Sequence, residues 1–472
     1  MLRPGARKSA LAAILSGCIG ALACDSPVQP AVCTEPWVGK TSVTARANNV
    51  LSAIVTADVR SADSVAVRFG LASGPTDSVT ASVAAGDTSA ASVPVLGLSA
   101  EAGYGMQLVA FNKCGATTGA LLTFATGALP ADLPRYTASG TDPTPGYVVF
   151  AAGGYGLVID NTGRVVWYHR LPGSVLNFQA QPNGRYAARP APANPSDIAR
   201  WIEINPLGDV TRTFGCARGL QPRLHDLLAQ SDGSYWLLCD EVRTVDLSGA
   251  GGSPQAPVLG TVVQHVSAAG DALFDWTPFD HFMVDLQAIE PGDRSGAVIN
   301  WTHGNALDLD TDGNLLVSFR NLSEITKIDT RTGAVMWRMG GRRNQFTFDD
   351  TAGPAFARQH GLRSTGAGRL LLLDNLGDPR ASRAERYEYD ETRRSVRLSG
   401  AYASSTGAIA QIGGTTQGLA GGRTLVSFGS GGSVEESDAA GRVVWRLEGN
   451  PGYVFRALRI RSLYQPGVGD PR

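Results

Sequence analysis

One sequence element recurs six times between residues 157 and 445 and constrains the fold more than any other feature. It is an alternating apolar strand, a turn of glycine or polar residues, and a second strand that often ends in tryptophan. The copies begin at Leu157, Trp201, Val263, Ile325, Glu385 and Val434. Neighbouring copies start 44 to 62 residues apart, which leaves room for a four-stranded blade in each. The repeat therefore predicts a six-bladed β-propeller.

The rest of the chain also predicts an all-β fold. The 57 glycines suit a protein with many tight turns. Residues 30–127 contain six or seven short strands separated by Gly, Asp and Ser turns, which predicts a β-sandwich. Residues 98–112 resemble a fibronectin type III corner, with Tyr104 as the corner tyrosine. We expect this small domain to hold the propeller off a membrane or to pack against a partner subunit, so a homodimer is one option.

A proline-rich stretch separates the two predicted domains. Residues 128–146 contain four prolines, and such a stretch cannot enter the interior of a sheet. We expect it to be a linker or strap, with the propeller at 147–472. Residues 454–464 are again strand-like, and we expect them to pair with the first or last blade and so close the ring.

The first 24 residues have the pattern of an export signal. A basic start precedes an apolar stretch, 10–23, that is too short for a comfortable membrane span. Cys18 and Cys24 each follow a sequence that resembles a bacterial lipobox. We favour Cys24 as the lipidated residue, because polar sequence begins directly after it; ordinary secretion with cleavage near Ala23 is the alternative. The expected location is the periplasm or cell envelope, with the membrane reached only through a lipid anchor.

Export to an oxidising compartment favours disulfides among the four remaining cysteines. Cys33 and Cys114 bracket the predicted sandwich, whereas Cys216 and Cys239 lie in one repeat on either side of His225. The economical pairing is therefore Cys33–Cys114 and Cys216–Cys239. A metal site is a poor alternative, because no Cys-x-x-Cys spacing exists.

Three of the six histidines occupy the same position in three successive repeats. His225, His303 and His360 are each followed, about ten residues on, by a turn and a short apolar strand. Equivalent positions of successive blades lie around one axis, so these side chains should face one another. Asn305 lies two residues after His303, on the same face of a strand. Arg320 ends the next strand, and we expect it to reach the same pocket.

Such a pocket is cationic, rich in donors and without a carboxylate nucleophile, which suits a compact anion. Neutral imidazole is also a good nucleophile toward phosphorus or sulfur near pH 7. Three alternatives remain: a metal such as zinc on the histidines, histidines that merely fill the channel, and a scaffold propeller without chemistry. The balanced charge, 41 basic against 42 acidic residues, gives no indication of a nucleic-acid partner.

An ordered series of motifs resembles the arylsulfate sulfotransferase family. The motifs are residues 301–307 (WTHGNAL), 312–320 (DGNLLVSFR), 325–341 (ITKIDTRTGAVMWRMGG) and 356–360 (FARQH), and the likeness extends over about 136–464. The resemblance implies an exported bacterial six-bladed propeller behind a β-sandwich. It also implies sulfuryl transfer from a phenolic sulfate ester to a phenol acceptor, without a nucleotide sulfate donor or other cofactor.

The resemblance further implies that His360 is the nucleophile of a ping-pong reaction through a sulfohistidine. His225, His303, Asn305 and Arg320 match the family's anion-stabilising residues. We expect His303, Asn305 and Arg320 to hold the sulfuryl oxygens and His225 to exchange a proton with the phenols. The chain departs from the family at residue 361, a glycine where the family often has Asp. The competing functions are a non-catalytic propeller lipoprotein that binds a ligand or partner in its channel, and a metal-dependent hydrolase.

Overall fold

The computed structural model describes residues 33–470, apart from 86–89, 174, 290, 295, 350–355 and 378–379. The predicted export signal, with Cys18 and Cys24, lies outside these residues. The described chain is all-β, as predicted, and its only α-helix is the four-residue α1 (Pro291–Arg294). None of its described helices has the length and apolar character that crossing a bilayer requires.

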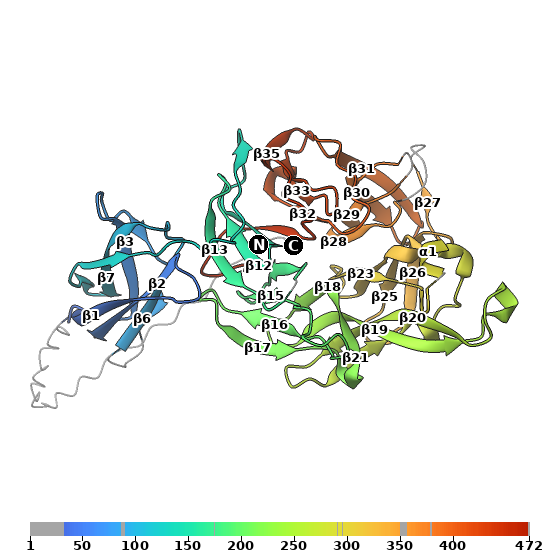
Figure 1. Cartoon of the computed structure of the whole chain (residues 1–472), viewed down its shortest axis with the longest axis horizontal. Coiled ribbons are helices and arrows are strands. Elements are labelled where there is room, and N and C mark those ends of the chain that lie inside the picture. Colours follow the sequence, from blue (N-terminus) through green and yellow to red (C-terminus); the bar gives the residue numbers. More distant parts are fainter. Residues whose placement is uncertain are drawn as a thin grey trace, which may run out of the picture.

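The N-terminal unit consists of two sheets that share one hydrophobic core, drawn in blue shades in Figure 1. One sheet contains β1 (Trp37–Ala45), β2 (Ser52–Arg60) and β6 (Ala90–Leu96). The other contains β3 (Ser64–Leu71), β4 (Ser78–Val79), β5 (Val83–Ala84), β7 (Gly103–Asn112), β8 (Gly115–Thr118) and β9 (Leu122–Ala125). The Tyr104 hydroxyl accepts a 2.7 Å hydrogen bond from the backbone N–H of Ser99, as a corner tyrosine does.

Six further sheets, mostly antiparallel, follow from residue 138 onward in the described chain. The first contains β11 (Tyr147–Ala152), β12 (Tyr155–Ile159), β13 (Val165–Arg170) and β36 (Ala457–Ile460); the second contains β14 (Phe178–Ala180), β15 (Tyr186–Ala188), β16 (Trp201–Ile204) and β17 (Val210–Phe214). The third contains β18 (Gln221–Ala229), β19 (Tyr235–Val245), β20 (Ala256–Val266), β21 (Ala272–Trp276) and β22 (Ile299–Asn300); the fourth contains β23 (Gly304–Leu309), β24 (Leu315–Phe319), β25 (Glu324–Ile328) and β26 (Val335–Gly340). The fifth contains β27 (Thr347–Phe348), β28 (His360–Gly366), β29 (Arg369–Asp374), β30 (Arg383–Asp390) and β31 (Ser395–Ala403); the sixth contains β10 (Ala138–Gly140), β32 (Thr415–Gly418), β33 (Thr424–Ser427), β34 (Val434–Ser437) and β35 (Val443–Leu447).

The innermost strands of these sheets form a closed ring, which Figure 1 shows to one side of the N-terminal unit. In chain order β18 contacts β23, β23 contacts β28, β28 contacts β32, and β32 contacts β36 of the first sheet. Strand β36 contacts β14, and Gln181, just after β14, accepts a 3.0 Å hydrogen bond from the backbone N–H of Ala229 in β18. The six sheets therefore surround one axis.

Strands near the two ends of the chain segment that forms the ring close it. Strand β36 pairs with β11 as the inner strand of the first sheet, which confirms the predicted closure by residues 454–464. Strand β10 pairs with β35 as the outermost strand of the sixth sheet. The proline-rich stretch 128–146 is therefore more than the linker we expected, because three of its residues form an edge strand. An edge position tolerates nearby prolines, since one side of the strand makes no ladder.

The repeated tryptophans join neighbouring sheets. Trp167 lies in β13 of the first sheet, Trp276 ends β21 of the third and Trp445 lies in β35 of the sixth, and all three are fully buried. Each indole N–H donates to a carbonyl in the outer turn of the next sheet: Pro206, Gly333 and Asn161, at 2.8, 3.1 and 2.9 Å. The last of these bonds connects the sixth sheet to the first. The recurrence of tryptophan in the sequence thus reflects contacts between sheets as well as burial.

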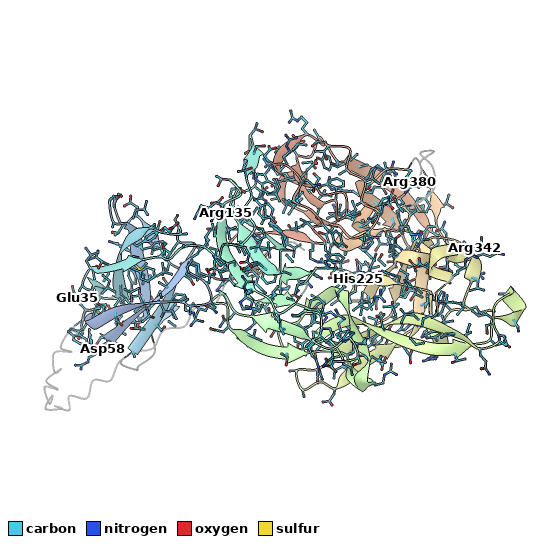
Figure 2. The ribbon with its side chains drawn as sticks, in the orientation of Figure 1. Glu35, Asp58, Arg135, His225, Arg342 and Arg380 are labelled. Atoms are coloured by element: carbon cyan, nitrogen blue, oxygen red, sulfur yellow. A yellow bond between two sulfur atoms is a disulfide. The ribbon has the colours of Figure 1, made fainter. Side chains whose placement is uncertain are left out.

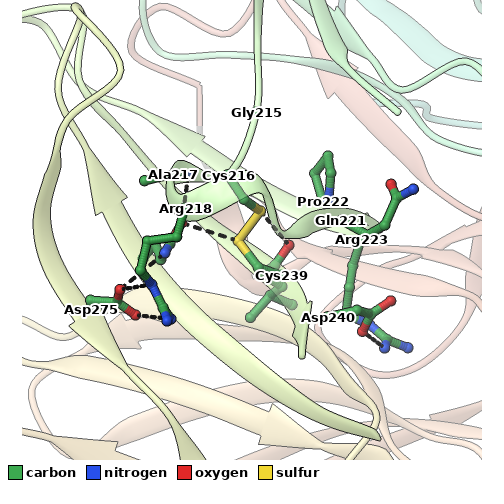
Figure 3. The surroundings of a disulfide bond; sticks show 12 residues. Gly215, Cys216, Ala217, Arg218, Gln221, Pro222, Arg223, Cys239, Asp240 and Asp275 are labelled. Atoms are coloured by element: carbon green, nitrogen blue, oxygen red, sulfur yellow. Dashed lines mark hydrogen bonds and ion pairs between the residues drawn. A yellow bond between two sulfur atoms is a disulfide. The ribbon is translucent and has the colours of Figure 1, made fainter. Parts of the chain in front are cut away.

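Both predicted disulfides are present in the structure. Cys33–Cys114 ties the start of the described chain to the turn between β7 and β8. Cys216–Cys239 ties the connection before β18 to β19, and Figure 3 shows it beside the ion pair of Arg223 and Asp240. The second disulfide therefore braces the segment that carries His225.

We expect the double variant Cys216→Ser/Cys239→Ser to lose about 3 kcal/mol of free energy of unfolding in the chain-entropy model, because the bond closes a loop of moderate length. Urea denaturation would measure this loss. The matched control, Cys33→Ser/Cys114→Ser, should destabilise only the N-terminal unit. Intact-mass analysis that finds free thiols at 216 and 239 in exported protein would contradict the pairing.

Candidate functional site

Each of the three inner strands that carry the predicted site is interrupted by a β-bulge at the site. In β18 the residues 223–226 face only Leu238 of β19. In β23 the extra residue is Asn305, and in β28 two residues, 361 and 362, face Leu372 of β29. Bulges re-aim side chains and are common beside active sites. Here they free His225, Asn305 and the start of β28 from regular sheet geometry.

The structure brings the three histidines together. The Nε2 atoms of His225 and His303 lie 3.3 Å apart, and the ring centroids of His225 and His360 are separated by 6.4 Å. His360 is 2% exposed, whereas His225 and His303 are partly exposed. The Phe455 ring packs edge-on against His225 and His360, with centroids at 5.7 and 6.5 Å. Figure 2 shows His225 near the middle of the ring of sheets.

The surroundings of His360 fix its tautomer. Its Nδ1 lies 3.1 Å from the carbonyl oxygen of Arg358 and 2.9 Å from Oδ1 of Asn375. The Asn375 amide nitrogen donates to the carbonyls of Ala410 and Gly413, so its oxygen must face His360. Because both neighbours of Nδ1 are acceptors, Nδ1 carries the proton and Nε2 keeps its lone pair.

The electrostatic environment keeps His360 neutral. Burial, assisted by the nearby Arg320 guanidinium, lowers the pKa of His360 to about 3. The hydrogen bonds to Asn375 and Arg358 act in the opposite direction, because they favour a charged imidazole. His360 is therefore a neutral imidazole near pH 7, with two acceptors already in place to stabilise a positive charge on the ring.

His303 and His225 form a relay of hydrogen bonds. The amide nitrogen of Asn300 lies 2.9 Å from Nδ1 of His303 and also donates to Asp293, so Nδ1 of His303 is an acceptor. His303 then donates through Nε2 to Nε2 of His225, which leaves the His225 proton on Nδ1. Burial, followed by the charge of Arg223, lowers the pKa of both histidines well below the ordinary value.

Several polar atoms of this cluster lack a hydrogen-bond partner among the described residues. They include Nδ1 of His225, Nε of Arg320 and Oδ1 of Asn305. A buried donor without a partner costs about 1–3 kcal/mol, so a cluster of such groups indicates a place where a ligand supplies the missing hydrogen bonds. The two unpaired N–H donors suit a group with several anionic oxygens.

Two guanidinium groups share one amide oxygen beside the histidines. Arg320 lies in a short turn, η5 (Arg320–Leu322), and donates to Oδ1 of Asn321 at 2.8 Å. Arg358 donates to the same oxygen at 3.0 Å, and its contact with Asp293 is 3.6 Å long. Burial lowers the pKa of Arg358 to about 10, so the group remains charged near pH 7. This concentration of positive charge favours an anionic ligand.

Asn305 has a different environment from the one we expected. Its amide nitrogen donates to the carbonyl oxygen of Gln359, at 2.6 Å, and so braces the backbone next to His360. The shared strand face with His303 is also absent. His303 precedes β23 and has a left-handed φ of +49°, while Asn305 lies in the bulge, so the period-two argument fails.

The backbone conformation at residue 361 explains why this chain has a glycine where the family often has Asp. Gly361 has a φ of +61°, and a Cβ atom there would lie 2.8 Å from Cα of Thr415. Any side chain would therefore collide with the inner strand of the sixth sheet and strain the backbone. An aspartate at this position does not fit the observed backbone.

Sequence reasoning missed several residues that complete the site. Asn375, Asn300 and Arg223 hold or surround the histidines, and Tyr453 and Phe455 enter from the segment before β36. Burial raises the pKa of Tyr453 to about 12, which leaves it a neutral phenol facing Arg320. These residues share no repeat position, so only the assumption that the closing segment reaches the axis would have found the last two.

An acidic cluster elsewhere in the ring is occupied by a lysine. Asp310, Asp312 and Glu391 form the one group of three potential metal ligands among the described residues. Nζ of Lys327 lies 2.7, 2.8 and 2.5 Å from their carboxylate oxygens, and the lysine is buried. This cluster is therefore an ion-pair network that connects the fourth and fifth sheets.

Comparison with solved structures yields distant likenesses. One is to a protein of unknown function from Bacteroides caccae, at 14% identity and a TM-score of 0.44, over 68% of this chain and 100% of that one. Another is to a streptogramin B lyase, at 13% identity and a TM-score of 0.36, over 66% and 82%. No curated protein matches the chain significantly.

The resemblance to the family is confirmed by a match over the segment that contains the site. The model of the family described as Arylsulfotransferase (ASST) matches residues 221–450. This segment extends from the start of β18 to just beyond β35, and it includes all three clustered histidines as well as Asn305 and Arg320. Over these residues, the chain matches the arylsulfotransferase (ASST) family.

Proposed function

We propose that the protein is a six-bladed β-propeller enzyme that moves a sulfuryl group from a phenolic sulfate ester to a phenol acceptor through a sulfohistidine. The observation that carries the proposal is the state of His360, a neutral imidazole with its Nδ1 proton held and its Nε2 lone pair available. This nucleophile lies among N–H donors that lack hydrogen-bond partners among the described residues. A nucleophile and an anion site in one place suit transfer of an anionic group.

In the first step, the Nε2 lone pair of His360 forms a bond to sulfur while the bond from sulfur to the phenolic oxygen breaks. The electron pair of that bond leaves with the phenolate. Neutral His225 would become an imidazolate if it gave up its proton, so its Nδ1–H instead stabilises the leaving oxygen with a hydrogen bond, and the phenolate takes a proton from solvent after it has left. The His360 ring becomes positive, and the carbonyl groups of Asn375 and Arg358 stabilise that charge through Nδ1. These acceptors are already oriented, so little reorganisation is needed.

In the second step, an acceptor phenol occupies the position that the first phenol has left. Its proton passes to solvent, its oxygen accepts the same hydrogen bond from Nδ1–H of His225 and attacks sulfur, and the N–S bond breaks with its electron pair returning to His360. Arg320 holds the sulfuryl oxygens in both steps, His303 orients His225 through its Nε2–H, and Asn305 fixes the backbone beside His360. Donor and acceptor therefore use one cavity in turn, which gives ping-pong kinetics.

The setting of the domain is part of the same proposal. Residues 1–24 act as an export signal with lipidation at Cys24, or at Cys18, and place the enzyme in the periplasm or cell envelope. Residues 30–127 form a fibronectin type III-like sandwich, supported by two sheets around one core and by the Tyr104 corner bond. The ring of six sheets from 147 onward is the catalytic propeller.

Incubation of the purified protein with 4-nitrophenyl sulfate and phenol tests this function. We expect release of nitrophenolate that depends on the acceptor. No release across a broad panel of phenols would reject the enzyme in favour of a binding propeller. Loss of activity on chelation would instead indicate a metal-dependent enzyme.

We expect His360→Ala to abolish the sulfo-enzyme that donor alone forms, because no other group supplies the nucleophile. His225→Ala should slow both formation and breakdown of the intermediate about a hundredfold, the usual cost of removing one donor to a developing oxyanion. His265→Ala is the matched control, since this ring stacks on Trp236 away from the cluster. Mass spectrometry of the quenched enzyme measures the intermediate, and a sulfo-adduct in His360→Ala would assign the nucleophile elsewhere.

The pH dependence of sulfo-enzyme formation should lack a limb near the ordinary imidazole pKa of about 6.5. A lowered pKa favours the neutral form, so His360 stays unprotonated as the pH falls to about 3. The single-turnover rate should therefore be constant between about pH 5 and 8. A loss of rate centred near pH 6.5 would show that His360 titrates as an exposed histidine.

A further inference from the structure

The segment that closes the ring also enters the site. Phe455 and Arg456 directly precede β36, and both are buried, at 3% and 1% exposure. Phe455 contacts the rings of His225 and His360, as described above. Arg456 lies beside it, with its guanidinium carbon 5.9 Å from the Phe455 ring centroid. This guanidinium has no role in the sulfuryl transfer proposed so far.

Arg456 holds the bulge on which His225 lies. Residues 223–226 are not paired one to one with β19, so their own sheet does not fix them. The carbonyl of His225 instead accepts hydrogen bonds from Arg456, at 2.9 Å, and from Asn177, at 2.8 Å. Arg456 also donates to Oδ1 of Asn177 at 3.2 Å. Side chains from the first and second sheets therefore support a bulge in the third.

A buried carboxylate extends this support to the nucleophile. Asp226 follows His225 and forms ion pairs with Arg456, at 3.0 Å, and with Arg363, at 2.9 Å. Arg363 lies three residues after His360 on β28. All three charged side chains are at most 4% exposed, and burying such groups is expensive. One carboxylate thus connects the His225 bulge, the strand of His360 and the closing segment.

We propose that Arg456 is a positioning residue for sulfuryl transfer, which holds the His225 bulge at its working distance from His360. The inference rests on the proposed function for its catalytic readout only. Closure of the ring and assembly of the site are then one event, because the residue that precedes the closing strand also clamps the bulge. Arg456 acts through His225 and does not need to touch the substrate.

The charge of Arg456 gives a second, separable effect. His225 faces Arg223, His303, His360 and Arg456, and His360 faces Arg320 and Arg456. Each positive charge lowers the pKa of the neighbouring imidazole, although Asp226 offsets part of the Arg456 charge. Removing the Arg456 charge should therefore raise the pKa of both histidines. The fall in the rate of sulfo-enzyme formation at low pH, the acid limb, should then move to higher pH.

Two substitutions separate position from charge. Arg456→Gln should slow sulfo-enzyme formation about a hundredfold, the size expected for a misplaced catalytic group, with little change in KM. It should also shift the acid limb to higher pH. Arg456→Lys keeps the charge but not the fork of donors, so it should return the limb to its original pH while the rate remains low.

Arg459→Gln is the matched control. Arg459 lies on β36, is 3% exposed and is ion-paired with Glu436. Its guanidinium donates hydrogen bonds to the carbonyl oxygen of Thr144 and to Oδ1 of Asn161, at the other end of the strand from Arg456. This variant should lower stability without altering the rate per folded molecule or the acid limb. If both variants change the rate and the limb equally, Arg456 has only a structural role and the proposal fails.

A measurement that does not depend on activity separates failure of the Arg456 proposal from failure of the proposed sulfuryl transfer. In protein labelled with ¹⁵N-histidine, the imidazole signals of His225, assigned by their loss in His225→Ala, report its tautomer and hydrogen bonding. Arg456→Gln should move these signals and leave those of His265 unchanged, even if the wild type proves inactive toward aryl sulfates. Unchanged His225 signals in folded Arg456→Gln would overturn the positioning role.

Discussion

The pairing of β36 with β11 is the contact on which the rest of the structure depends. It matches Tyr147 with Ile460 and so completes the first sheet with a strand from more than 300 residues later in the chain. Without it, β11 would present an unpaired edge at the axis, and the contacts of β36 with β32 and β14 would be lost. The cluster of histidines needs neighbouring sheets to pack side by side, because its members come from three different sheets.

The outline of the fold could be predicted from the sequence, but the details of the site could not. The hairpins that begin at Leu157 and Val434 are visible as alternation and turns, and the disulfides follow from cysteine placement. Bulges leave no such signal, since they depend on how one strand meets its neighbour. The period-two rule therefore gave Asn305 the wrong setting, and the edge strand β10 was hidden among prolines.

Burial is the main cause of the lowered pKa values of the histidines at the site. It holds all three histidines in the neutral form and leaves Nε of Arg320 without a hydrogen-bond partner among the described residues. Such an arrangement is unfavourable for stability, because a buried donor or charge without a partner raises the free energy of the folded state. The surrounding framework of tryptophan contacts and the Lys327 network offsets that cost in other parts of the ring.

The order of strands along the chain has a consequence for synthesis. The inner strand of the first sheet is the last strand of the described chain, so a growing polypeptide carries that sheet one strand short until residue 460 has been made. Long-range pairing of this kind is slow and leaves an edge available to other chains in the meantime. The unfinished protein therefore has an incomplete first sheet and depends on remaining unaggregated until β36 has been made.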